Sequence, residues 1–121
     1  MMHKISCLVI DDEPLALKLI RSYVEKTHFL ELKGVCSNAF EAMEQLEREP
    51  VDLLFLDIQM PDLNGMELIR TLARAPKVIF TTAFSEYAID GFKVDAVDYL
   101  LKPFNYEEFL KAANKAKERI L

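Results

Sequence analysis

The stretch Val51-Asp52-Leu53-Leu54-Phe55-Leu56-Asp57 is a strongly apolar run that ends in an acid. A short apolar run bounded by turn residues is typical of a strand that is buried on both faces. The breaker-rich segment 61–65 follows, and the pattern after it predicts a helix from Met66 to Arg74. A buried strand that leads into a helix is the repeating unit of α/β folds with a parallel sheet.

The same unit recurs on both sides of this stretch. Apolar runs predict further strands at 5–10, 30–36, 78–82 and 96–101. Helices are predicted after Pro14 through Val24, from Asn38 through Leu46, near 86–92, and from Asn105 to the C-terminus. Asn-x-x-Glu patterns at Asn38 and Asn105 indicate capping boxes. Together these elements predict an α/β fold, a five-stranded parallel sheet with helices on both faces.

Composition narrows the class of protein. The 121 residues fit one domain spanning 1–121, and the net charge of −5 argues against a surface that grips nucleic acid by its phosphates. No stretch approaches the roughly 20 apolar residues of a membrane span, and acids at 11–13 interrupt the first apolar run. Cys7 and Cys36 lack metal-binding or disulfide spacing, so buried, reduced thiols are expected. We therefore expect a cytoplasmic protein with no membrane contact.

Chemically distinctive residues stand where the predicted strands end. Asp11 and Asp12 follow the first strand, Asp57 the third, Thr82 closes the fourth, and Lys102 follows the fifth. In open parallel sheets, ligands bind beyond the carboxyl ends of the strands. Each residue alone has an ordinary explanation, since strand-end acids favour turns and threonine favours strands. The whole set at matching strand ends is much harder to explain in that way.

Three carboxylates at one edge repel one another unless a cation joins them. Mg²⁺ is the natural candidate because it prefers oxygen ligands and binds through one or two carboxylates plus phosphate, and Mn²⁺ is possible. A carboxylate can also be a nucleophile toward phosphorus, giving an aspartyl phosphate. In such a site Lys102 would pair with a carboxylate before transfer and with phosphoryl oxygen after it, and the Thr82 hydroxyl would donate to the phosphoryl group.

Four segments carry a resemblance to a known family: Val9-Ile10-Asp11-Asp12-Glu13-Pro14, Leu56-Asp57-Ile58-Gln59-Met60-Pro61, Thr82-Ala83 and Tyr99-Leu100-Leu101-Lys102-Pro103-Phe104. Over essentially its whole length the chain resembles the receiver domain of two-component response regulators. The resemblance implies the flavodoxin-like (βα)5 receiver fold with strand order 2-1-3-4-5. It also implies a signalling domain that is not an enzyme toward other substrates and catalyses only its own phosphorylation and dephosphorylation.

The resemblance assigns roles in the phosphorylation site. Asp57 would accept a phosphoryl group from the phosphohistidine of a sensor histidine kinase. Asp12, Asp57 and the backbone carbonyl of Gln59 would hold Mg²⁺, while Asp11 would act through water. Gln59 and Phe84, two residues after the phosphoacceptor and the switch threonine, occupy positions that tune how fast water removes the phosphoryl group. The bulky Phe84 predicts slow self-dephosphorylation, with packing on the neighbouring helix as the alternative.

The resemblance also implies a switch. Thr82 would move toward the phosphoryl group, Tyr99 would swing inward, and Lys102 would contact the phosphate, with a cis peptide bond before Pro103. These movements would alter the face formed by the fourth helix, the fifth strand and the last helix, through which we expect a homodimer. The candidate apolar contributors to this face are Tyr87, Ile89 and Phe92. Ile89 and Phe92 fit a role in the core equally well.

Two further segments are similar to a narrower group. Ala83-Phe84-Ser85-Glu86-Tyr87-Ala88 and the run 94–103 resemble receivers of the LytR/AlgR type, whose full-length proteins carry a LytTR DNA-binding domain. That output domain is absent from this chain. We therefore expect a piece of a longer transcription regulator rather than a stand-alone receiver, with DNA contact only through the output domain.

Three other readings fit parts of the pattern. A flavodoxin-like cofactor binder needs a Ser/Thr/Gly-rich phosphate loop after the first strand, where this chain has acids at 11–13. A haloacid-dehalogenase-type phosphatase carries an Asp-x-Asp pair there and a substrate-covering cap, for which 121 residues leave no space. A pseudo-receiver that only docks partners is disfavoured by the complete set of site residues.

Overall fold

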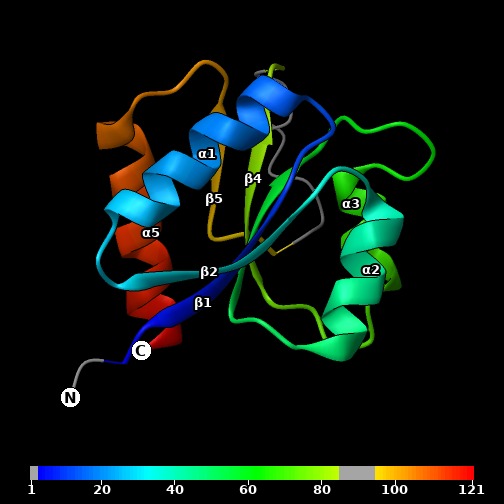
Figure 1. Cartoon of the computed structure of the whole chain (residues 1–121), viewed down its shortest axis with the longest axis horizontal. Helices are drawn as coiled ribbons and strands as arrows, with labels where there is room; N and C mark the ends of the chain where they lie inside the picture. Colours follow the sequence, from blue (N-terminus) through cyan, green and yellow to red (C-terminus); the bar gives the residue numbers. More distant parts are fainter. Residues whose placement is uncertain (1–2, 85–94) are drawn as a thin grey trace.

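The computed structural model describes residues 3–84 and 95–121. Its five strands are β1 (Ile5–Ile10), β2 (Leu30–Cys36), β3 (Leu53–Asp57), β4 (Lys77–Thr82) and β5 (Asp98–Leu101). They form one parallel sheet in the order β2-β1-β3-β4-β5 (Figure 1). The predicted sheet and its strand order are therefore confirmed.

Helices cover both faces of the sheet, as predicted. The described helices are α1 (Pro14–Lys26), α2 (Ala39–Arg48), α3 (Gly65–Thr71) and α5 (Tyr106–Ile120). In Figure 1, α1 and α5 lie on one side of the sheet, and α2 and α3 lie on the other. The helix predicted near 86–92 lies outside the described residues, as do Tyr87, Ile89 and Phe92. No helix of the described ranges is long and apolar enough to cross a membrane.

Asparagine side chains cap the starts of α2 and α5. Asn105 accepts the Glu108 N–H at 2.9 Å, and the Glu108 carboxylate accepts the Asn105 N–H at 3.0 Å, so the predicted capping box is confirmed. Asn38 accepts the Glu41 N–H at 2.8 Å, but the Glu41 carboxylate accepts the N–H of Ser37 instead of that of Asn38. The box predicted at Asn38 is therefore one-sided.

Some element boundaries differ from the predictions. Helix α3 ends at Thr71 rather than at Arg74, because Leu72 is extended with φ −82° and ψ 127°. The segment after it leads to Pro76, whose ring disfavours helical conformation in the residue before it. Strand β5 begins at Asp98, two residues later than predicted, and strand β3 begins at Leu53, two residues after the start of its apolar run.

The alternation of side chains along the strands separates two apolar cores. Phe55 of β3 and Ile79 of β4 pack on the side of α1 and α5, where the Phe55 and Phe109 rings stack at 4.9 Å. Their neighbours Leu54 and Phe80 pack on the side of α2 and α3. Apolar side chains therefore cover both faces of the sheet, and polar side chains gather at the strand ends.

Both cysteines are buried in these cores as free thiols. Burial raises the pKa of Cys7 to about 12 and that of Cys36 to about 11. Both side chains therefore stay neutral and pack as small apolar groups, as predicted.

Candidate functional site

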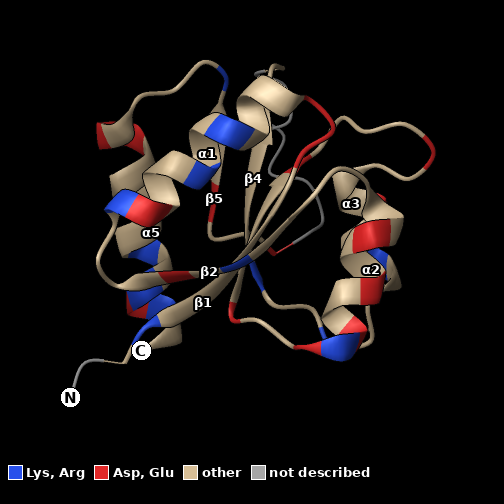
Figure 2. Ribbon diagram, in the orientation of Figure 1, with Lys and Arg blue, Asp and Glu red and all other residues tan. Residues whose placement is uncertain are grey.

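Three carboxylates converge at the carboxyl edge of the sheet. Asp57 is the last residue of β3, and Asp11 and Asp12 follow the neighbouring strand β1. One oxygen from each of the three lies within 4.8 Å of the others. The acidic segment where β1 passes into α1 is visible in Figure 2. The parallel topology thus brings together acids that are far apart in the sequence.

Lys102 reaches this cluster from the end of β5. Its Nζ lies 2.9 Å from Asp11 Oδ2 and 3.5 Å from Asp57 Oδ1. Burial lowers the pKa of Lys102, but the hydrogen bond that its ammonium donates to Asp11 and the charges of both carboxylates outweigh burial, and the pKa is raised. Lys102 is therefore an ammonium that partly neutralises two buried acids.

Backbone hydrogen bonds fix the two buried acids in place. Asp11 Oδ1 accepts the Glu13 N–H at 2.9 Å, and Asp57 Oδ1 accepts the Gln59 N–H at 3.2 Å. Each acid therefore bonds the backbone two residues ahead, the pattern with which aspartate turns a chain at a strand end. The turn-forming role and the chemical role of these residues are compatible.

The ionised form of Asp57 is destabilised in the folded domain. Burial, followed by the negative charge of Asp11, raises the pKa of Asp57 to about 7, although Lys102 and the Gln59 N–H oppose the shift. A cation between the carboxylates relieves both causes. Three carboxylate oxygens also form the hard donor set that Mg²⁺ prefers, so the residues fit a magnesium ion.

Gly65 is a site residue that the sequence did not single out beyond its place in a breaker-rich turn. A Cβ added at Gly65 would lie 2.5 Å from the backbone oxygen of Asp57. The Gly65 N–H donates to the Ile58 carbonyl at 2.9 Å. The start of α3 therefore presses directly on the backbone of Asp57, and only glycine permits this approach.

The side chains of Thr82 and Tyr99 contact residues other than the three carboxylates. Thr82 is fully buried, and its hydroxyl accepts the Phe84 N–H at 3.0 Å. The ring of Tyr99 stacks on Phe80 at 5.5 Å, in the core on the side of α2 and α3. Among the described residues, the buried Tyr99 hydroxyl has no hydrogen-bond partner, and burial raises the pKa of Tyr99. In the part of the chain that the structure describes, neither predicted switch residue has a side-chain hydrogen bond to a carboxylate of the site.

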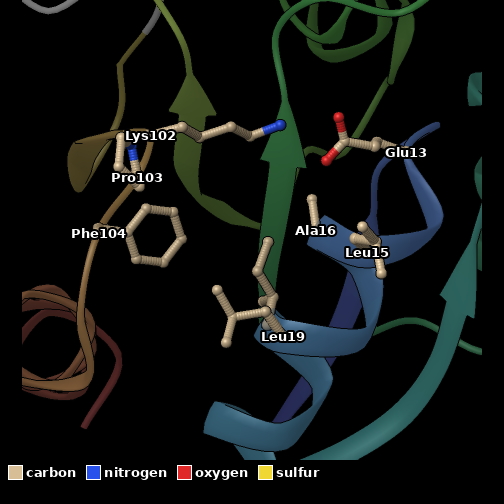
Figure 3. Close-up of a pocket in the computed structure, with 8 residues that line it drawn as sticks. Glu13, Leu15, Ala16, Leu19, Lys102, Pro103 and Phe104 are labelled. Atoms are coloured by element: carbon tan, nitrogen blue, oxygen red, sulfur yellow. The ribbon is translucent and has the colours of Figure 1, made fainter.

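Two hollows meet at Lys102. One contains the acids and is lined by Asp12, Asp57, Gln59, Ala83 and Lys102, together with Glu13 and Pro14. The other is an apolar groove between α1 and the segment after β5, lined by Leu15, Leu19, Pro103 and Phe104 and bordered by Glu13 and Lys102 (Figure 3). The Lys102–Pro103 peptide bond is cis, the isomer that the resemblance implied.

Comparison with known proteins agrees with this geometry. Residues 7–114 match the response regulator receiver domain family. The chain is 40% identical over 116 residues to the transcriptional regulatory protein BtsR of Escherichia coli (strain K12), covering 94% of this chain and 48% of that protein. It is 37% identical over 115 residues to the sensory transduction protein LytT of Bacillus anthracis, covering 93% and 47%.

A solved structure extends the similarity to three dimensions. The REC domain of AraT, a response regulator from Geobacillus stearothermophilus, matches with a TM-score of 0.83 at 30% identity, covering 98% of this chain and 95% of that one. The chain spans about half the length of the curated relatives it matches.

Proposed function

The chain belongs to the response regulator receiver domain family, the phosphoacceptor module of two-component signalling, and we propose that Asp57 is the residue that is phosphorylated. This assignment rests on the surroundings of Asp57. Its carboxylate is buried, the ammonium of Lys102 lies 3.5 Å away, and two further acids lie close enough to bind the same cation. Family membership supports this function over that of a flavodoxin-like cofactor binder or a phosphatase.

Mg²⁺ is the proposed cofactor, and Mn²⁺ has the same ligand preference. Asp12 and Asp57 would hold the ion together with the backbone carbonyl of Gln59, and Asp11 would act through water. When bound, the ion neutralises the carboxylates and draws in the oxygens of a phosphoryl donor. Asp12 is exposed to the pocket, so it is the acid best placed to exchange water for a ligand.

The proposed transfer makes one bond and breaks one. An oxygen of Asp57 attacks phosphorus, while the bond between phosphorus and the nitrogen of a kinase histidine breaks and leaves its electron pair on the imidazole. Lys102 then pairs with a phosphoryl oxygen in place of the Asp57 carboxylate. Thr82 and Tyr99 would rearrange toward the new charge and alter the face built by the fourth helix, β5 and α5.

The apolar groove beside Lys102 supports a sensor histidine kinase as the partner. Leu15 and Leu19 on α1 are 77% and 42% exposed, although both are apolar. Both line the groove, and Figure 3 shows Leu19 of α1 on the side opposite Phe104. A partner that brings a histidine to Asp57 has to cover this groove as well, because Glu13 and Lys102 border both hollows. Apolar anchors in a groove are the usual source of binding energy at such interfaces.

The longer protein would place this domain before a DNA-binding LytTR output domain, act in the cytoplasm and regulate transcription. The relatives support this proposal, since BtsR is named a transcriptional regulatory protein and LytT a sensory transduction protein. We expect homodimerisation through the face of the fourth helix, β5 and α5. On that face the Lys115–Asp98 ion pair at 3.1 Å ties α5 to β5.

Phe84 is the proposed determinant of phosphoryl lifetime, together with Gln59. The Phe84 side chain is 46% exposed beside Ala83, which lines the acidic pocket. We infer that a bulky apolar group next to a residue that lines the pocket hinders attacking water. Phe84→Ala is therefore expected to shorten the lifetime of the phosphorylated domain, and an unchanged rate of phosphoryl loss would refute this role.

Incubation with acetyl phosphate and Mg²⁺, followed by intact mass measurement, tests the proposed function. The wild-type domain is expected to gain one phosphoryl group, and Asp57→Asn is expected to gain none. An intact protein that gains no phosphoryl group would instead indicate a pseudo-receiver that docks partners without being phosphorylated.

A further inference from the structure

Thr81, the neighbour of the predicted switch threonine, shares a sheet face with the carboxylates. Thr81 of β4 pairs with Asp57 of β3 on one side and with Leu100 of β5 on the other. Phe55, Ile79 and Leu100 all belong to the core beneath α1 and α5. Because side chains alternate along a strand, Asp57 and Thr81, each two residues further on, point to this same side.

The side chain of Lys102 spans the strand that carries Thr81. Lys102 follows β5, yet its ammonium lies at Asp57 on β3, and β4 stands between these two strands. Figure 3 shows the Lys102 side chain running across the end of β4 toward β3. Thr81 is therefore the β4 residue that pairs with the carboxylate that Lys102 contacts.

The hydroxyl of Thr81 has no partner in this resting arrangement. Thr81 is fully buried, and within residues 3–84 and 95–121 its Oγ1 makes no hydrogen bond. A buried hydroxyl without a partner is unfavourable, and such groups are rare enough in folded proteins to need an explanation. A β-branched residue chosen only for its strand propensity would serve better as valine, which carries no polar atom.

We propose that Thr81 is a positioning residue for Lys102, whose ammonium bonds the Thr81 hydroxyl once a phosphoryl group is attached to Asp57. An ammonium has three N–H donors, and in the resting site the ammonium of Lys102 contacts Asp11 and Asp57. Phosphorylation turns the Asp57 carboxylate into an uncharged acyl group, so one of these bonds weakens and the ammonium shifts toward the phosphoryl oxygen. The inference rests on the proposed function and adds a residue to it.

We therefore expect the Thr81 hydroxyl to destabilise the resting domain and to stabilise the phosphorylated one. Thr81→Val keeps the shape and removes only the hydroxyl, while Thr81→Ser keeps the hydroxyl and removes the methyl group. In the presence of Mg²⁺, beryllofluoride serves as the probe of the phosphorylated state. Thr81→Val is expected to raise the Tm of the metal-free domain and to weaken beryllofluoride binding about tenfold, as for the loss of one hydrogen bond to a charged group.

Beryllofluoride binding by the two variants and the wild type tests whether the hydroxyl or the methyl group of Thr81 is responsible. Thr81→Ser is expected to bind beryllofluoride within about twofold of the wild type, and the bound ¹⁹F resonance nearest Lys102 is expected to move only in Thr81→Val. Equal binding by Thr81→Val and the wild type would overturn the inference, as would equal weakening in both variants, because methyl packing would then explain the effect. If the wild type itself binds no beryllofluoride, the proposed function fails first.

Discussion

The ammonium of Lys102 lies 2.9 Å from the carboxylate of Asp11, although 91 positions separate the two residues in the chain. Asp11 is completely buried, and a buried carboxylate is tolerated only with a partner. The same ammonium also faces Asp57, so one cation serves two buried acids. The positive charge of Lys102 therefore stabilises both carboxylates. A phosphoryl group or a metal ion would change how this charge is shared between them.

Removal of this cation should destabilise the resting domain. Lys102→Met leaves Asp11 and Asp57 buried without a counter-charge, and we expect the free energy of unfolding to fall by about 3 kcal/mol at pH 8. Urea unfolding measures this loss. Lys115→Met is the matched control, because its pair with Asp98 is exposed and should contribute about 1 kcal/mol or less. Equal effects of the two variants would contradict the account.

The raised pKa of Asp57 predicts a pH dependence of stability. The carboxyl has a pKa of about 7 in the folded domain and an ordinary value of 3.8. Between these values the folded state binds the extra proton, so stability should fall as pH rises from about 4 to 7 in metal-free buffer. Asp57→Asn should flatten this part of the profile of Tm against pH, and Mg²⁺ should raise the Tm of the wild type at pH 8 but not that of the variant. Profiles of Tm against pH that run parallel for the two proteins would refute the assignment of the raised pKa to Asp57.

Gly65 should be intolerant of any side chain. Gly65→Ala places a methyl group 2.5 Å from the Asp57 carbonyl, so α3 or the phosphoacceptor backbone has to move. We expect a loss of about 1–3 kcal/mol in unfolding free energy, together with slower phosphorylation by acetyl phosphate. Gly34→Ala is the control, because its new methyl group meets the flexible end of the Gln45 side chain. The proposed contact would be wrong if the two substitutions cost the same.

The groove on α1 should matter for the kinase and not for a small phosphodonor. Leu15→Asp places a charge on a highly exposed position and should leave the fold intact. Phosphoryl transfer from a histidine kinase active on the wild type should slow at least tenfold, the effect of losing about 1.4 kcal/mol at the interface. Phosphorylation by acetyl phosphate should be unchanged. Phe40→Asp, at an exposed position on α2, is the control, and a loss of transfer as large in that variant would contradict the docking surface.

Much of this site could be predicted because topology carries the information. Once the apolar runs are identified as parallel strands, Asp11, Asp57 and Lys102 must meet at one edge. The pairing of Lys102 with Asp11 as its nearest partner, rather than with Asp57, could not be predicted, because three acids stand at the same edge of the sheet.

Other features depend on geometry that residue patterns do not contain. The close approach of Gly65 to Asp57 depends on where α3 begins, and glycine in a turn has a simpler explanation. The two adjacent threonines look alike in sequence, but the strand register places Thr81 beside Asp57. Helix α3 was predicted too long because its pattern continues past the point where the chain extends toward Pro76.

Borohydride trapping of the phosphorylated residue tests the central claim most directly. After treatment with acetyl phosphate and Mg²⁺, borohydride reduces an aspartyl phosphate to homoserine, which peptide mass mapping then locates. We expect homoserine at position 57 in the wild type, with Asp11 and Asp12 unmodified. Homoserine at position 11 or 12, or none at any position, would contradict the assignment of Asp57 as the phosphoacceptor.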